Sequence, residues 1–290
     1  TLHLKVDDKG DVTGFYYSDK DGSKYEVSGK VSNAPQHKVE FLVTYNHRET
    51  NQPQTFSYSN LGPKWTFDWI SYVKDNPADL NADVSVYLRG AGAETLSGFD
   101  PTSQSYAIEP YSHAQLVRTS SSPIRYERRL PDGGVETFSQ PDWAVIFPRK
   151  VLLTSWKDPQ GNTVTLTYDA SFRIVAVTDD IGQVSTLSYQ HATDPLKITK
   201  VTVPFGRFAS FDYNSQGQLQ RITDVIGITS EFVYESGDFI KALTTPYGTT
   251  TFATEGPSSF DRFVEITDPL GGREKVLYRV TTSPIPSSEP

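Results

Sequence analysis

Apolar and polar residues alternate in short bursts along most of this chain. The clearest burst is Val39, Phe41, Val43 and Tyr45, in which every second residue is apolar. Because alternate side chains of a strand share one face, this spacing predicts strands with one buried side. Turns rich in glycine and aspartate separate the bursts, and no segment shows a helical period. The pattern therefore predicts an all-β protein.

In the second half of the chain, a tyrosine recurs seven residues after a glycine. The five pairs are Gly161/Tyr168, Gly182/Tyr189, Gly206/Tyr213, Gly227/Tyr234 and Gly271/Tyr278. The first four glycines follow one another at steps of 21, 24 and 21 residues. Self-similarity at a fixed period is typical of stacked supersecondary units. We therefore predict an array of antiparallel β-hairpins over residues 151–280, with these glycines and tyrosines as its structural repeat positions.

The rest of the chain divides into three further predicted segments. Residues 1–35 contain short alternating runs between Asp/Gly turns, which predicts a β-meander. Residues 36–150 form a lead-in region in which Trp65 and Trp69 follow a Gly-Pro turn. Large aromatic residues dominate the energetics of cores, so we interpret the two tryptophans as a packed plug, with an exposed aromatic surface as the alternative. Residues 281–290 are rich in proline and serine and are predicted to be disordered.

Composition narrows the possible partners. The net charge is −8 and no cluster of lysine and arginine stands out, which disfavours nucleic acid. No apolar run approaches the roughly 18 residues that a membrane-spanning helix needs, so we expect no membrane insertion. The chain begins at Thr1 and contains neither methionine nor cysteine. We therefore expect a part of a longer protein that is stabilised by sheet packing without disulfides.

The candidates for catalysis are few. An enzyme needs a nucleophile with its base, a carboxylate pair or a set of metal ligands in one place. The five histidines include no two at metal-ligand spacing. Asp179, Asp180, Asp224 and Asp268 stand just before repeat glycines, where aspartate is expected to bind its own turn backbone. We predict a non-enzymatic protein without catalytic residues, cofactors or bound metals.

Three strings of residues point to a known family. The first is Tyr168-Asp169, Arg173-Ile174, Val177-Thr178-Asp179 and Gly182, which recurs in modified form from Tyr213 to Gly227. The others are Leu61-Gly62-Pro63-Lys64-Trp65 and Arg129-Leu130-Pro131-Asp132-Gly133. Over residues 39–279 the chain resembles the Rhs/YD-repeat family of bacterial rearrangement-hotspot proteins, which is related to toxin-complex C components and teneurins. Phe172 departs from the pattern, because the family usually has a turn glycine there.

The resemblance implies a sheet of hairpins that winds into a shell around a toxin or similar cargo. It favours a non-enzymatic structural segment that encapsulates or displays a C-terminal effector, secreted or at the cell surface. The implied partners are the remainder of a longer Rhs-type chain or its effector. The alternative is an extracellular module that recognises a glycan or cell-surface protein through the hairpin strip. Asp268-Pro269-Leu270-Gly271-Gly272 partly resembles the family's self-cleavage motif, but its spacing favours a repeat turn.

Overall fold

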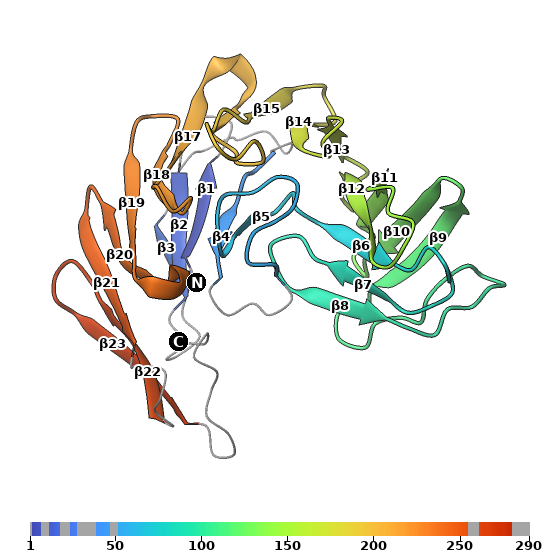
Figure 1. Cartoon of the computed structure of the whole chain (residues 1–290), viewed down its shortest axis with the longest axis horizontal. Coiled ribbons are helices and arrows are strands. Elements are labelled where there is room, and N and C mark those ends of the chain that lie inside the picture. The colour runs from blue at the N-terminus through green and yellow to red at the C-terminus, as the bar shows by residue number, and fades with distance from the viewer. Residues whose placement is uncertain are drawn as a thin grey trace.

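The structure is a computed structural model that describes residues 2–6, 12–17, 24–27, 39–46, 52–254 and 261–279. This part of the chain forms β-strands joined by turns, with two short 3-10 segments at Pro204–Gly206 and Ser236–Asp238 (Figure 1). The strands pair antiparallel, most of them with their neighbours in sequence. The prediction of an all-β array of antiparallel hairpins is confirmed. The predicted tail, residues 281–290, lies outside the described residues.

A smaller sheet joins the start of the chain to the lead-in region. Its strands, in spatial order, are β3 (Lys24–Val27), β2 (Val12–Tyr17), β1 (Leu2–Val6), β4 (Val43–Tyr45) and β5 (Trp65–Phe67). Strand β1 pairs with β4 at Leu4 and Val43, so this sheet extends across residue 35. The division of the chain into four segments stays a prediction.

The larger sheet contains the remaining strands. Its first part is β6 (Tyr72–Asp75), β7 (Val84–Tyr87), β8 (Ala93–Leu96), β9 (Gln115–Ser121), β10 (Ile124–Arg129), β11 (Val135–Pro141) and β12 (Arg149–Lys157). The hairpin array continues with β13 (Thr163–Tyr168), β14 (Ile174–Thr178), β15 (Val184–Ser188), β16 (Lys200–Thr202), β17 (Phe208–Tyr213) and β18 (Leu219–Thr223). It ends with β19 (Thr229–Tyr234), β20 (Ile240–Thr245), β21 (Gly248–Thr254), β22 (Asp261–Thr267) and β23 (Arg273–Arg279).

Strand β12 is the junction between the lead-in strands and the repeats. Its first residues, Arg149 to Leu152, pair with β6, and its last residues, Ser155 to Lys157, pair with β13. Along its other edge it pairs with β11. Arg149 is also bound to the buried carboxylate of Asp75 in β6, with Nη2 and Oδ2 2.6 Å apart. Strand β12 therefore connects the lead-in strands to the hairpin array within the larger sheet.

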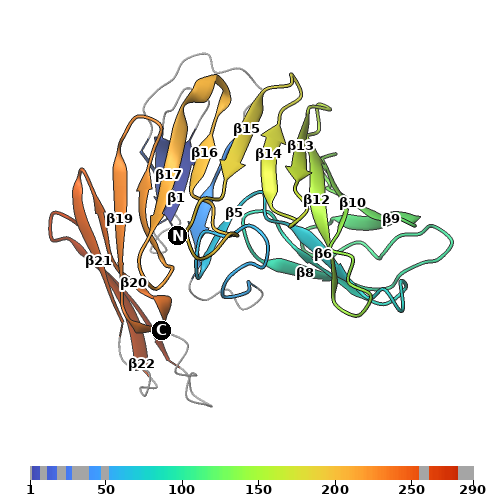
Figure 2. The same ribbon diagram turned by 45° about the horizontal axis from the view of Figure 1, so that its top comes forward.

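The larger sheet curves around the smaller one. From β13 to β19 the strands lie side by side along the curve, and β4 and β5 lie inside it (Figures 1 and 2). Apolar side chains from both sheets form one core, which includes Phe67, Trp65 and Trp69 of the lead-in region and Phe211 and Phe232 of the array. The described residues contain no helix long and apolar enough to cross a lipid bilayer.

Candidate functional site: the inner face of the hairpin array

The repeat glycines Gly182, Gly227 and Gly271 lie in turns that aspartate side chains close. At Asp179 the carboxylate Oδ1 accepts hydrogen bonds from the backbone N–H groups of Ile181 and Gln183. Asp224 and Asp268 bind the equivalent two N–H groups of their own turns. Each repeat glycine lies three residues after its aspartate at positive φ, 84° for Gly182. The interpretation of these three aspartates as turn residues is confirmed.

Four of the repeat tyrosines make the same kind of hydrogen bond. Each hydroxyl donates to the backbone carbonyl oxygen 15 residues earlier, at oxygen–oxygen distances of 2.5 to 2.7 Å. The pairs are Tyr168 with Leu153, Tyr189 with Ile174, Tyr213 with Ile198 and Tyr234 with Leu219. Burial raises the pKa of all four tyrosines above the usual range of a phenol, so the hydroxyls remain donors. We call these four residues the tyrosine row.

A lead-in segment, residues 59–65, runs across the tyrosine row. We call this segment the strap. Its contacts with the array follow the order of the repeats, from the hairpin that contains Ile174 to the one that contains Tyr234. Leu61 and Trp65 of the strap are 2% and 3% exposed. The strap is therefore part of the core.

The first strap contacts are polar and involve the array backbone. Ser59 Oγ accepts a hydrogen bond from the Ile174 N–H at 2.9 Å and lies 2.7 Å from the Tyr189 hydroxyl. Since that hydroxyl already donates its proton to the Ile174 carbonyl, the serine is the donor to Tyr189. Asn60 forms a parallel bridge with Lys197, through backbone hydrogen bonds of 2.9 Å on either side of it.

The middle of the strap approaches the array most closely at Gly62. This glycine has a φ of +91°, and a Cβ atom there would lie 2.9 Å from the carbonyl oxygen of Gly217. The position requires glycine for two reasons: the left-handed backbone and the close approach of a second backbone. The glycine of the Leu61-Gly62-Pro63 string is therefore explained by contact with the array.

Trp65 ends the strap at the last tyrosine of the row. Its Nε1–H donates to the Tyr234 hydroxyl at 2.9 Å, and its ring lies 4.9 Å from that of Phe232, edge to face. Tyr45 in β4 extends the contacts to the next turn, because its hydroxyl donates to the Asp238 carbonyl and accepts from the Ile240 N–H. Indole and phenol groups thus supply both packing area and hydrogen bonds at this end.

Trp69, the other predicted plug residue, lies beyond the strap and is 2% exposed. Its Nε1–H donates to the Glu40 carbonyl at 2.8 Å. The guanidinium of Arg89 lies 4.5 Å from the Trp69 ring and 4.7 Å from the Trp156 ring. Burial raises the pKa of the neighbouring Asp68 from 3.8 to about 6, although Arg89 opposes this shift. Trp69 thus anchors the lead-in region against β12 through a cation held between two indole rings.

The last hairpin, β22–β23, contrasts with the strapped hairpins. The residue two positions before the repeat tyrosine is Leu166, Leu187, Phe211 and Phe232 in the tyrosine row, and each of these is at most 7% exposed. The equivalent Val276 in β23 is 52% exposed, and its neighbour Leu277 is 73% exposed. The side chain of Tyr278 lies outside what the structure describes. The apolar pattern of the repeat therefore continues into β23 without the cover that the earlier hairpins have.

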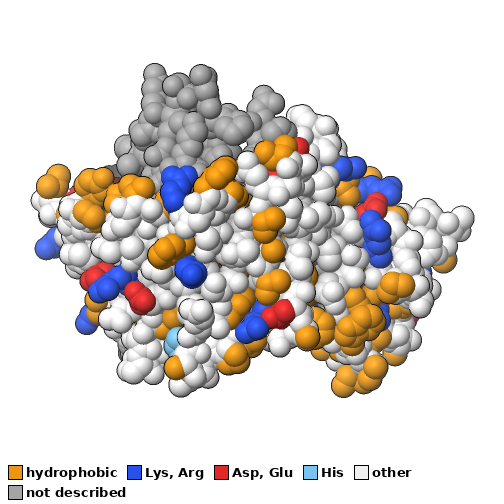
Figure 3. Space-filling model, turned by 90° about the horizontal axis from the view of Figure 1, so that it is seen from above, with side chains coloured by type: hydrophobic (Ala, Val, Ile, Leu, Met, Phe, Trp, Pro, Cys, Tyr) orange, Lys and Arg blue, Asp and Glu red, His pale blue; other side chains and the backbone are white. Residues whose placement is uncertain are grey.

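A second set of apolar residues lies on the outside of the turns. The residue before each of five repeat or repeat-like glycines is large, apolar and exposed: Ile181, Phe205, Ile226, Tyr247 and Leu270. From above, hydrophobic side chains appear in several separate groups among polar ones (Figure 3). Gly206 and its preceding Phe205 both have positive φ, within the short 3-10 segment.

Several functional contacts had no signal in the sequence. Ser59 and Asn60 are small polar residues of a kind that occurs throughout the chain, and only the fold brings them to the array. Phe172 adopts a φ of 59° at the position where a turn glycine was expected, and its ring packs edge-on against Tyr58 at 5.5 Å. Phe172 thus combines the left-handed backbone of this turn with an apolar contact to the lead-in region that glycine could not make.

The described residues hold no cluster of three His, Asp or Glu side chains with the geometry of a metal site. His191 packs edge-on against the Tyr213 ring at 5.3 Å, and its Nδ1 accepts the Asp194 N–H. The chemistry that this face does offer is hydrogen bonding and apolar contact between the array and the strap.

Comparison with known proteins supports the family resemblance over a limited range. Residues 152–180, which include β13, β14 and Tyr168, match the family model described as RHS Repeat. No curated protein sequence matches the chain.

Solved structures with some likeness are those of TcdB2-TccC3-Cdc42, of TcdB2-TccC3 without its hypervariable C-terminal region, and of TcdB2-TccC3-TEV. Their TM-scores are 0.28, 0.26 and 0.25, and their sequence identities are 11%, 12% and 8%. The matches cover 91–92% of this chain and 11–16% of those chains. Because these TM-scores are low, the family resemblance is based on the match of residues 152–180 to the family model. The match of residues 152–180 to the RHS Repeat model confirms the resemblance to the Rhs/YD-repeat family over that range.

Proposed function

We propose that this chain is a non-enzymatic structural segment of a longer Rhs-type shell that encapsulates or displays a C-terminal effector. It forms the lead-in and first repeats of that shell. The RHS repeat at residues 152–180 supports this proposal. The partners are then the remainder of the Rhs-type chain and its effector, and the shell acts outside the cell or at its surface.

The proposal rests on a difference along the array: the strap and β4 bury the inner face of the earlier hairpins but not that of the last one. From β14 to β20 the strap and β4 contact the inner face, so this part has no room for cargo at the tyrosine row. At β23 the same repeat register presents Val276, which is 52% exposed. Apolar side chains in a regular register that are not covered mark a surface made for another partner. We therefore assign the strapped hairpins to a closed end of the shell and β22–β23 to its continuation.

The geometry does not favour the alternative of a binding module that uses the tyrosine row. A glycan platform needs exposed aromatic faces, whereas these four tyrosines are half-buried and their hydroxyls are bound to the array backbone. Trp65 and Trp69 are buried as well.

The proposal is tested in the full-length protein that contains this chain. Limited proteolysis of the region after the repeats would be compared between the natural protein and the Trp65→Ala variant, with Trp143→Ala as the control because Trp143 is 65% exposed. We expect the C-terminal region to resist protease in the natural protein and the control, and to become sensitive in Trp65→Ala. Equal sensitivity in all three proteins would contradict encapsulation.

A further inference from the structure

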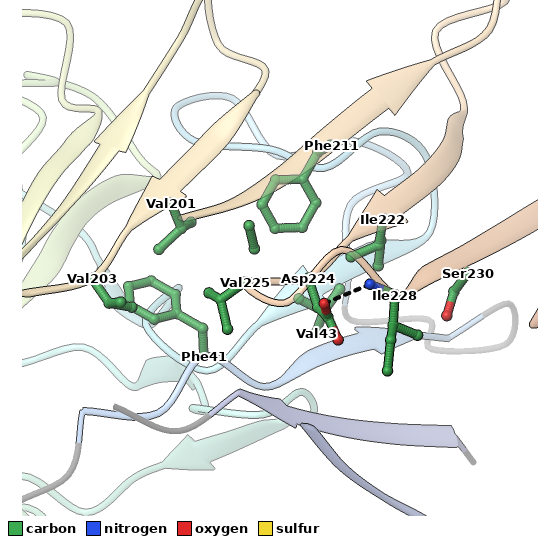
Figure 4. A pocket seen from close by; sticks show the side chains of 11 residues that line it. Phe41, Val43, Val201, Val203, Phe211, Ile222, Asp224, Val225, Ile228 and Ser230 are labelled. Atoms are coloured by element: carbon green, nitrogen blue, oxygen red, sulfur yellow. Dashed lines mark hydrogen bonds between the residues drawn. The ribbon is translucent and has the colours of Figure 1, made fainter. Parts of the chain in front are cut away.

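Two hollows of different character lie along the later hairpins. The first, between Phe41, Val43 and strands β16 to β19, is apolar and has a volume of about 60 Å³ (Figure 4). The second lies between β18 and β19, beside the turns at 214–218 and 235–239, and has a volume of about 530 Å³. Sites for small ligands usually have volumes of roughly 300–1,000 Å³. We call this second hollow the polar cleft.

The polar cleft opens because two neighbouring strands diverge. Strand β18 begins at Leu219 and β19 ends at Tyr234, but their pairing stops at Arg221 and Glu231. Beyond that pair the two strands lead into separate turns. None of the described residues that line the cleft is a lysine or an arginine. Its polar side chains are four amides and two carboxylates: Asn214, Gln216, Gln218, Gln220, Glu235 and Asp238.

Two earlier repeats hold a cation where the polar cleft has Gln218. The position is the residue just before each carbonyl that accepts a hydrogen bond from the tyrosine row. In chain order its residues are Leu152, Arg173, Lys197 and Gln218. The Arg173 guanidinium lies 4.7 Å from the centre of the Tyr189 ring, and Lys197 Nζ lies 5.4 Å from that of Tyr213. Cations within about 6 Å of a phenol ring are attracted to its face.

Both of these cations also have an acidic partner close in sequence. Arg173 Nε donates to Asp169 Oδ2 at 2.7 Å, and Lys197 Nζ donates to Asp194 Oδ2 at 2.8 Å. The Arg173 guanidinium reaches the next hairpin as well, because its Nη1 donates to the Pro195 carbonyl at 2.7 Å. In these two repeats a positive charge therefore occupies the space beside the tyrosine.

Beside Tyr234 neutral amides replace the ion pair, and a carboxylate remains. Asn214 Nδ2 donates to Gln218 Oε1 at 2.7 Å. The Nε2 groups of Gln218 and Gln54 donate to the two carboxylate oxygens of Asp238, at 2.7 and 2.8 Å. Burial raises the pKa of Tyr234, and the charge of Asp238 adds to this rise. The polar cleft thus places negative charge next to a phenol ring, where the earlier repeats place a cation.

We propose that the polar cleft binds an arginine side chain of another polypeptide. The guanidinium takes the place that Arg173 fills in its own repeat, beside the Tyr234 ring and against Asp238 and Glu235. A guanidinium group is planar, stacks on aromatic faces and donates to more than one carboxylate oxygen. The amide oxygens of the cleft accept its remaining N–H groups. The site does not depend on the proposed shell, because the cleft is formed by this chain alone.

The test is a titration of this chain with the capped tripeptide N-acetyl-Gly-Arg-Gly amide, followed by NMR chemical shifts. The same tripeptide with citrulline in place of arginine has nearly the same shape and no charge. We expect saturable shifts around Val233, Tyr234 and Gly237 with the arginine tripeptide. The citrulline tripeptide should bind at least about fivefold more weakly, because it loses the cation–π contact and the charge-assisted hydrogen bonds.

Free L-arginine separates a site for a polypeptide from a site for the amino acid. Its α-carboxylate brings a negative charge towards Glu235 and Asp238, whereas the capped tripeptide brings backbone amides that the exposed Gln216 and Gln220 can bind. We expect the tripeptide to bind more tightly than free L-arginine.

Gln218→Arg rebuilds the arrangement of the Arg173 repeat and fills the polar cleft with a guanidinium of the chain itself. The arginine tripeptide should bind at least about fivefold more weakly to this variant, which should still unfold cooperatively in a thermal melt. The matched control is Gln160→Arg, the same change at an exposed turn residue outside the cleft. Asp238→Asn should also weaken binding, and asparagine tolerates the left-handed backbone of this residue, φ 66°.

Four results would each overturn the proposal. They are the absence of saturable shifts with the arginine tripeptide, equal binding of the citrulline tripeptide, tighter binding of free L-arginine than of the tripeptide, and equal binding of the tripeptide to Gln218→Arg and Gln160→Arg.

Discussion

The strapped hairpins and the β22–β23 hairpin have the same repeat register but different surroundings. In the tyrosine row, the residue two positions before the tyrosine is buried in all four repeats, whereas Val276 at this position in β23 is half exposed. The difference does not come from the repeat residues, which are apolar in both regions. It comes from the strap, which ends at Trp65 and Tyr234. A repeat therefore sets the register of a hairpin, and a segment far away in sequence decides whether its inner face is covered.

The largest effect is expected where the strap ends. Trp65→Ala removes a buried indole and its hydrogen bond to Tyr234, which should lower the free energy of unfolding by about 3–5 kcal/mol. Val276→Ala, at the same register position of the uncovered hairpin, should change it by no more than about 1 kcal/mol, because about half of that side chain is already exposed to water. Urea denaturation measures both. Equal losses would mean that the two regions are not covered differently.

Gly62 offers a sharper test of close contact. Gly62→Ala and Gly92→Ala both place a side chain at a φ of +91°, but a Cβ at Gly92 would meet no atom within 4 Å. The strain of the left-handed backbone is therefore common to both variants. The clash with the Gly217 carbonyl should make Gly62→Ala less stable than Gly92→Ala by about 1–3 kcal/mol. If the two variants unfold at the same urea concentration, the strap does not touch the array there.

Removal of single hydroxyls should have smaller, graded effects. Tyr213→Phe leaves the Ile198 carbonyl without its donor and should cost about 1 kcal/mol. Tyr234→Phe deprives both the Leu219 carbonyl and the Trp65 Nε1–H of a partner, so its cost should be larger, up to about 3 kcal/mol. In a double-mutant cycle with Trp65→Phe, only Tyr234→Phe should show coupling. Equal coupling of Tyr213 and Tyr234 to Trp65 would contradict the ordered contacts.

A further effect appears only when the pH is varied. Burial raises the pKa of Asp68 to about 6. The folded protein therefore holds the carboxyl proton of Asp68 more tightly than the unfolded chain does. The resulting stabilisation is complete below about pH 4 and is lost as the pH rises through about 6. Asp68→Asn should remove this part of the pH dependence of the melting temperature. Asp100→Asn is the control, since the turn N–H of Thr102 helps to lower the pKa of that exposed carboxyl. An unchanged profile in Asp68→Asn would contradict the shift.

The strands were predictable from the sequence because they depend on local pattern. The two-residue alternation and the seven-residue Gly-to-Tyr interval identify the hairpins and their turns. The bond from each tyrosine to a carbonyl 15 residues earlier depends on how neighbouring hairpins pair, so no local pattern reveals it. The strap contacts of Ser59 and Asn60 span more than 100 residues. Such contacts form only when the two sheets pack against each other. Small polar residues such as Ser59 and Asn60 give no indication in the sequence that they will lie at this interface.

If the strap protects the hairpins it crosses and leaves β22–β23 unaffected, the two regions should respond differently when the strap is weakened. Hydrogen exchange by mass spectrometry of the natural chain and Trp65→Ala under native conditions measures both regions at once. We expect β18 to β20 to lose protection in the variant, because Tyr234 and Phe232 lose their contacts with Trp65, whereas β23 should exchange as in the natural chain. Unchanged protection in β18 to β20, or an equal loss in β23, would contradict it.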